Sequence, residues 1–174
     1  MNFPKISIIT PSYNQGQFLE ETILSVLNQD YPNLEYIIID GGSSDNSVEI
    51  IKKYEKRLAF WVSGPDKGQT HAINKGLKQS TGEILNWINS DDVLSVGSLK
   101  IIGKAFNGNP EADFCFGDFS MIDEKGRLLI SRKSPPYRFR TLFYGRQLSC
   151  QPTVFFRRSV IERIGYLDET LGFC

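Results

Sequence analysis

The chain has 174 residues, of which 40% are hydrophobic and 23% are charged. It is long enough to bury a core as one domain, and its composition excludes intrinsic disorder, collagen-like repeats and coiled coils. The 20 lysines and arginines balance 20 aspartates and glutamates, so the charge gives no reason to expect a nucleic acid partner. No apolar run is long enough to span a bilayer, and the N-terminus lacks the pattern of an export signal.

The cysteine and histidine contents narrow the chemistry further. The cysteines Cys115, Cys150 and Cys174 are odd in number and widely spaced, which disfavours a disulfide framework or zinc ribbon and favours a reducing cytoplasm. A single histidine, His71, excludes the H-E-x-x-H zinc site and multi-histidine metal centres. The serine nucleophile elbow and the Walker A motif are also absent from the sequence.

The first half of the chain alternates short apolar runs with amphipathic segments. The runs predict strands buried on both faces, and the amphipathic segments predict helices. We expect strands at 5–10, 36–40, 58–62 and 83–89, and helices at 17–30, after 45 (carrying Val48, Ile51 and Tyr54) and at 70–79. Glu20 and Glu21 are expected in the first turn of the first helix, where the helix dipole favours negative charge. This alternation predicts an α/β domain with a parallel, Rossmann-like sheet covered by helices on both faces.

The second half is less regular. It predicts a helix at 97–107 and strands at 114–119, 127–131 and 153–157, with no docking helix at the C-terminal end. We expect these strands to extend the first sheet, so that residues 1–174 form a single domain.

Polar residues stand at the carboxyl ends of three predicted strands, at Thr10–Ser12, Asp40–Gly42 and Asp91–Asp92. In open α/β sheets ligands bind in the crevice beyond these ends, so we expect the three segments to converge there.

Adjacent carboxylates at the mouth of a buried sheet repel each other, and a divalent cation such as Mg²⁺ or Mn²⁺ relieves that repulsion. Asp91 and Asp92 are therefore candidate metal-site residues. The alternative is that one of them caps the helix at 97–107 or a short turn before it. Asp40 precedes a Gly-Gly turn, which suits hydrogen bonding to a ribose or a base edge.

Four segments together resemble the family 2 glycosyltransferases, in the order seen in that family. They are Ile8–Asn14, Ile39–Asp45, Pro65–Gln69 and Asn89–Asp92. The resemblance spans essentially the whole chain. It implies the GT-A fold, a three-layer α/β/α arrangement with a mixed, mostly parallel sheet, in which 1–95 is the nucleotide-binding half and 96–174 the acceptor-side half. It also implies a nucleotide-sugar donor, a divalent metal and inversion at the anomeric carbon.

The resemblance assigns roles to individual positions. Asp40 is similar to the carboxylate that hydrogen-bonds the base, and Lys67 to a basic residue near the base or diphosphate. Asp91 stands nearer the ribose or sugar, and Asp92 is the expected metal ligand. The full set of expected nucleotide-sugar contacts is Thr10, Pro11, Ser12, Tyr13, Asp40, Gly41, Ser43, Lys67 and Asp91.

In relatives of this family the general base belongs to an acidic pair that follows the segment resembling 165–169. This chain ends at Cys174, where that pair would begin, so we expect a C-terminally truncated product with the donor site but without the base. Asp168 and Glu169 are the carboxylates in the chain that would substitute for it, although their family counterparts precede the base. The alternatives are a non-catalytic module that binds nucleotide-sugar, and another Rossmann-like enzyme such as a nucleotidyltransferase.

The function implied is a hexosyltransferase that uses a UDP-sugar and a saccharide or lipid-linked saccharide acceptor in cell-surface polysaccharide synthesis. Gln151–Pro152 is a candidate for the acceptor side. The basic residues at 132–133, Arg138 and Arg140 form a solvated face or, alternatively, hold an anionic lipid-linked acceptor at the membrane. We expect a cytoplasmic protein, with peripheral association at the inner face of the membrane as the alternative.

Overall fold

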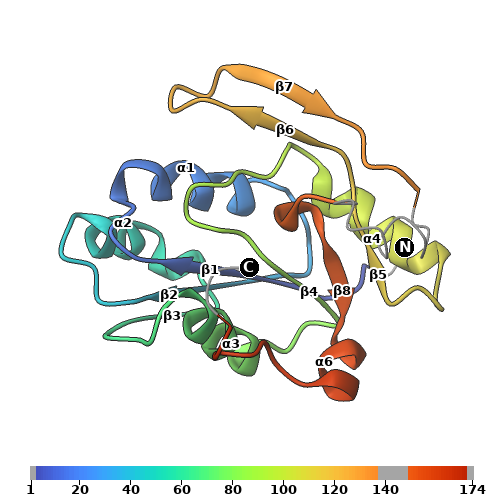
Figure 1. Ribbon diagram of the computed structural model, residues 1–174, viewed down its shortest axis with the longest axis horizontal. Coiled ribbons are helices and arrows are strands. Elements are labelled where there is room, and N and C mark those ends of the chain that lie inside the picture. Colours follow the sequence, from blue (N-terminus) through green and yellow to red (C-terminus); the bar gives the residue numbers. More distant parts are fainter. Residues whose placement is uncertain (1–2, 137–148, 172–174) are drawn as a thin grey trace.

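The computed structural model describes residues 3–136 and 149–171. Within them, a six-stranded sheet has the strand order β3-β2-β1-β4-β8-β5, and helices cover both of its faces (Figure 1). Strands β1 to β4 are parallel, whereas β8 is antiparallel to its neighbours β4 and β5. The strands of this sheet are β1 (Ile6–Ser12), β2 (Leu34–Asp40), β3 (Phe60–Ser63), β4 (Ile84–Trp87), β5 (Phe114–Cys115) and β8 (Phe155–Arg157). The mixed, mostly parallel α/β sheet predicted from the sequence is confirmed.

Two apolar cores lie on opposite faces of the sheet. All seven residues of β1 are buried, because the strand pairs on both sides and is covered on both faces. Its side chains alternate, so Ile8 packs into the core with Leu19 and Ile23, and Ile9 packs into the core with Ile73. The helices are α1 (Gly16–Leu27), α2 (Ser47–Tyr54), α3 (Gln69–Gln79), α4 (Ser98–Gly108) and α6 (Arg158–Ile164), with 3₁₀ turns η1 (Glu55–Arg57) and η2 (Gln151–Thr153).

The expected strand at 114–119 is wrong as a single element. The chain forms the short edge strand β5 and then, after Gly117, a separate strand β6 (Phe119–Ile122). β6 pairs antiparallel with β7 (Leu128–Arg132) in a two-stranded sheet that stands apart from the main sheet (Figure 1). Asp123 and Gly126 close the turn between them, with Gly126 at a φ of 72°. The expectation that both 114–119 and 127–131 extend the first sheet is therefore corrected.

Two helix expectations also change. Helix α1 starts at Gly16, so Glu20 and Glu21 lie beyond its first turn, which contains no acidic residue. Helix α6 was not expected, because its seven residues start directly after β8 with no side chain that caps its N-terminus. Tertiary contact places it, since Ile161 packs against the second core.

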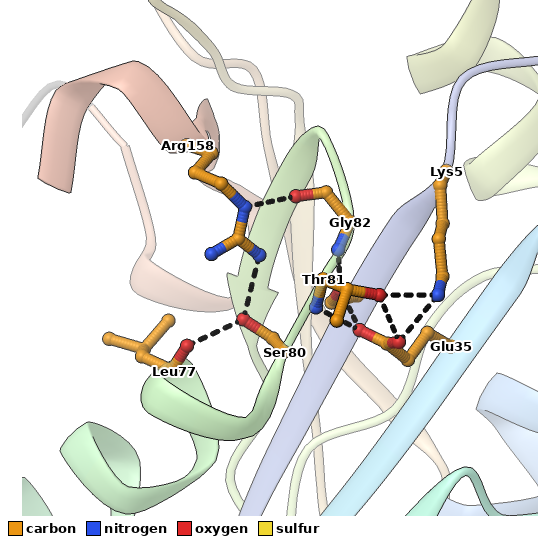
Figure 2. A network of polar contacts seen from close by, with 8 residues as sticks. Lys5, Glu35, Leu77, Ser80, Thr81, Gly82 and Arg158 are labelled. Carbon is orange, nitrogen blue, oxygen red and sulfur yellow. Dashed lines mark hydrogen bonds and ion pairs between the residues drawn. The ribbon is translucent and has the colours of Figure 1, made fainter. Parts of the chain in front are cut away.

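A buried carboxylate links the N-terminal ends of three strands, at the edge opposite the polar strand ends (Figure 2). Glu35 accepts hydrogen bonds from the Ser7 hydroxyl (2.5 Å) and from both the amide and the hydroxyl of Thr81 (2.6 and 2.7 Å), and it pairs with Lys5 at 2.6 Å. The Ser7 hydroxyl in turn accepts from the Gly82 amide. Burial alone would raise the pKa of Glu35, but these donors hold it at about 2.

This carboxylate predicts how stability depends on pH. Because the folded-state pKa of Glu35 lies below its ordinary value of 4.5, its contribution is complete above pH 4.5 and is lost as the pH falls through about 2. Replacing Glu35 with glutamine should lower the free energy of unfolding at pH 7 by about 2 kcal/mol and flatten its fall between pH 5 and pH 2. Urea unfolding at several pH values measures this, with the exposed Glu111→Gln as control. Parallel pH profiles for wild type and Glu35→Gln would contradict the prediction.

Candidate active site

The carboxyl ends of the parallel strands lie in one row. Ser12 pairs in register with Asp40, and Asp40 pairs with Ser63 on the other side. The chain after β4 follows β1 toward the same edge, because the Ile88 amide donates to the Ile9 carbonyl at 2.8 Å. The predicted convergence of the polar strand ends is therefore confirmed.

A cavity of about 910 Å³ opens at this edge, which is the size of a small-molecule site. Of the residues expected to contact a nucleotide-sugar, Pro11, Ser12, Tyr13, Gly41 and Asp91 line it. The remaining lining residues are Gln15, Gly42, Pro65, Asp66, Gly68, Gln69, Ala72, Asn89 and Ser90. The Ser12 hydroxyl is buried and has no hydrogen-bond partner within the described chain, so a hydroxyl or oxygen of a bound ligand would satisfy it.

Asp40 does not line the cavity and is fully buried. Its carboxylate accepts hydrogen bonds from the amides of Gly42 (3.1 Å) and Ser43 (2.9 Å) and from the hydroxyls of Ser43 and Ser63. These four bonds fold the Gly41–Ser43 loop around the end of β2. Asp40 therefore shapes the wall of the cavity from behind.

Three other expected contacts also lie outside the cavity lining. The Thr10 hydroxyl is buried and bonds the Tyr36 hydroxyl at 3.0 Å, and Ser43 is engaged by Asp40. Lys67 is exposed, and its amide donates to the Nδ1 atom of His71 at 3.3 Å. The structure therefore brings together the residues that line the wall and leaves these three behind or beside it.

The acidic loop after β4 is fixed by polar side chains from two helices. The hydroxyl of Thr22, in α1, donates to the carbonyls of Ser90 and Asp92, both at 2.9 Å. Asn89 donates to the Asp92 carboxylate at 3.2 Å and accepts from Gln69, at the start of α3, at 2.7 Å. The loop therefore has a defined path across the mouth of the sheet.

The two acidic side chains of this loop differ in environment. Asp91 is exposed and borders the cavity, whereas Asp92 is partly buried. Burial raises the pKa of Asp92 to about 6, and the Asp91 carboxylate adds to this shift while the Asn89 hydrogen bond opposes it. Neither aspartate caps α4, because the residue before that helix is Gly97, with no side-chain cap. The alternative that one of them caps this helix is therefore wrong.

The donor set fits a divalent cation. Asp91 and Asp92 offer hard oxygen ligands, and no ion pair neutralises either of them in the described chain. Among residues 3–136 and 149–171, no cluster of three or more His, Cys, Asp or Glu side chains surrounds a possible metal position. A cation at this loop would complete its coordination with diphosphate oxygens and water, as Mg²⁺ commonly does.

A second cavity, of about 780 Å³, also borders the acidic loop. Asp91 borders both cavities, and Asp92 borders the second. Its other walls come from α4, β6 and the segment around Pro152. Gln151 donates to the Trp87 carbonyl at 2.7 Å, which holds this segment against the end of β4.

The model of a protein family described as "Glycosyl transferase family 2" matches residues 7–165, nearly the whole chain. The chain belongs to glycosyl transferase family 2. An uncharacterized glycosyltransferase of Haemophilus influenzae is 32% identical over 166 residues, covering 92% of this chain and 65% of the relative. A GalNAc(5)-diNAcBac-PP-undecaprenol beta-1,3-glucosyltransferase of Campylobacter jejuni is 33% identical over 130 residues, or 72% of this chain and 41% of the relative.

The crystal structure of S. aureus TarS 1–349 has the same fold, with a TM-score of 0.78 and 26% identity over 98% of this chain and 52% of TarS. TarS in complex with UDP aligns with a TM-score of 0.77 and 25% identity, over 96% of this chain and 51% of TarS. The fold of this family 2 chain is the GT-A fold. The chain spans 65% or less of these proteins' lengths.

The two carboxylates considered as substitute bases are both engaged elsewhere. Asp168 accepts hydrogen bonds from the amide and hydroxyl of Thr170, which lower its pKa. Glu169 accepts from Asn74 at 3.0 Å, which lowers its pKa, and neither carboxylate lines the large cavity or the one that borders Asp92. Lowered pKa values make both poorer proton acceptors. The expected base beyond residue 174 stays a prediction.

Asp66, Gln69, Asn89 and Thr22 are among the residues of this family 2 site that sequence reasoning missed. Asp66, Gln69 and Asn89 fall within the segments that carry the family resemblance, but in the Pro65–Gln69 segment the resemblance assigned a role only to Lys67. Thr22 lies in the middle of α1 with no motif around it. Only the packing of α1 against the acidic loop reveals its role.

Proposed function

We propose that this family 2 chain binds a UDP-sugar and takes part in transferring the sugar, with inversion, to a saccharide or lipid-linked saccharide acceptor in cell-surface polysaccharide synthesis. The observation that carries the proposal is the cavity at the carboxyl ends of β1, β2 and β4, which has Asp91, the first residue of the acidic pair, on its rim. TarS, which shares this fold, has been crystallised with UDP.

In this proposal the cavity between Pro11 and Asp91 receives the nucleotide. Ser12 and Tyr13, at the end of β1, would contact the nucleoside. The diphosphate would lie toward the acidic loop, where Thr22 and Asn89 hold Asp92 in place.

Asp91 and Asp92 would hold Mg²⁺ or Mn²⁺. When bound, the cation stabilises the negative charge that develops on the leaving nucleoside diphosphate. The chain itself places the two carboxylates side by side and keeps the Asp92 side chain partly dry, which strengthens its interaction with a cation.

The acceptor would approach through the second cavity, because Asp91 borders both this cavity and the donor cavity. The Campylobacter relative is named for a lipid-linked saccharide acceptor, which supports an acceptor of this class here. None of the helices in the described ranges is long and apolar enough to cross a bilayer. We propose a cytoplasmic location with peripheral contact to the membrane. Arg138 and Arg140, predicted to help in that contact, lie outside the described residues.

Calorimetric titration of UDP and GDP into the chain, with Mn²⁺ and with EDTA, tests the donor site. We expect UDP to bind at least about 10-fold more tightly with Mn²⁺ than with EDTA, because the cation bridges the acidic pair and the diphosphate. GDP should bind more weakly than UDP under both conditions. If neither nucleotide binds with Mn²⁺ present, the proposed donor site is wrong.

A further inference from the structure

One wall of the donor cavity is formed where Tyr13, Gly41 and Asp66 meet. A Cβ atom placed on Gly41 would lie 2.9 Å from the Oδ2 atom of Asp66 and 3.3 Å from the Cδ2 atom of the Tyr13 ring. Gly41 has no positive φ, so its backbone conformation does not require glycine. The glycine instead leaves room for the Asp66 carboxylate, which occupies the space that a side chain at position 41 would need.

The Asp66 carboxylate is held in one orientation with one oxygen available. Its Oδ1 atom accepts the Gly68 amide at 2.8 Å, which folds the turn before α3. In the described part of the chain Oδ2 has no hydrogen-bond partner, and it faces Gly41 on the cavity wall. Tyr13, which lies beside it, is 64% exposed. A fixed acceptor oxygen therefore stands next to an open aromatic ring.

We infer that Asp66 recognises the base of the nucleotide, accepting a ring N–H at Oδ2 while the base lies against Tyr13. This inference rests on the proposed function and assigns the base contact to Asp66 in place of Asp40. Asp40 is fully buried behind the loop, and its oxygens already accept four hydrogen bonds.

The chemistry of the carboxylate selects among bases. An ionised carboxylate only accepts hydrogen bonds, so it pairs with the N3–H donor of uracil and not with the N3 acceptor of cytosine. Guanine presents two adjacent N–H donors on its Watson–Crick edge, which suit a carboxylate with two free oxygens. Because the Gly68 amide already occupies Oδ1, the one free oxygen of Asp66 suits the single N3–H of uracil better than the two donors of guanine.

The test compares UDP and CDP binding to the wild type and to Asp66→Asn, by calorimetry with Mn²⁺. Asparagine keeps an oxygen for the Gly68 amide and replaces the free acceptor with an NH₂ donor. We expect UDP affinity to fall about 10- to 100-fold, because a charge-assisted hydrogen bond to the base is lost. CDP affinity should hold or rise, since the amide can donate to N3 of cytosine.

Two further variants keep the test decisive. Gly41→Ala should push the Asp66 side chain out of position and lower the preference for UDP over CDP in the same direction. Asp30→Asn, a matched change at an exposed position in the α1–β2 connection, should leave both affinities unchanged. Melting curves establish that each variant is folded.

The outcomes separate the inference from the proposed function. A wild type that binds no UDP overturns the donor site itself. A wild type that binds UDP and CDP equally, or folded Asp66→Asn and Gly41→Ala variants that keep the wild-type preference for UDP, would overturn the role of Asp66 and leave the donor site in place.

Discussion

Replacing Asp92 with alanine is expected to weaken Mn²⁺-dependent UDP binding by at least about 100-fold, because the cation loses one of its two protein carboxylates. The folded chain should not lose stability. Asp92 is partly buried beside Asp91, and the raised pKa of its carboxyl shows that its ionised form is poorly solvated there. Removing it takes an unfavourable charge out of the folded state.

Calorimetry with Mn²⁺ and with EDTA, together with melting temperatures, measures both effects. Residual UDP binding in EDTA should be similar for Asp92→Ala and the wild type, since Asp92 does not line the donor cavity. Glu124→Ala, on the turn between β6 and β7, is the control and should change neither quantity. Undiminished Mn²⁺-dependent binding in a folded Asp92→Ala protein would rule out its role as a metal ligand.

Replacing Asp40 with alanine is expected to lower the free energy of unfolding by about 3–4 kcal/mol, which corresponds to a melting temperature about 10 °C lower. The substitution leaves two backbone amides and two hydroxyls without their acceptor at a fully buried position. The stability of Asp40→Asn should lie between that of the wild type and that of Asp40→Ala. Its amide keeps one acceptor oxygen and turns an NH₂ group toward the remaining donors.

This result distinguishes two roles for Asp40. If Asp40 organises the loop, stability falls with the substitution, and UDP affinity falls because the cavity wall loses its shape. If Asp40 contacts the base, UDP affinity falls while the melting temperature stays the same. Asp91→Ala is the matched comparison at the same edge of the sheet, where the exposed carboxylate should contribute little to stability.

The parallel half of the sheet and the position of the site were predictable because their signals are local. The apolar run at β1 predicts a strand buried on both faces, and polar residues at Asp40 and Asp91 mark strand ends that a parallel sheet must bring to one edge. In the second half of the chain the sequence signals for strands and their partners are weaker. β5 has only two residues. β6 pairs with β7 outside the main sheet, and the turn at Asp123 is what brings these two strands together.

The sequence by itself determined the α/β class, the family and the edge of the sheet at which the site lies, because hydrophobic periodicity and ordered motifs depend on neighbours along the chain. Tertiary structure alone decided the environment of each carboxylate at this edge. Asp40, Asp66 and Asp92 are the same residue type near similar strand ends, yet one is buried under four donors, one faces the cavity, and one is partly dry beside another charge. Burial and hydrogen-bond partners, which come from distant segments, set these differences.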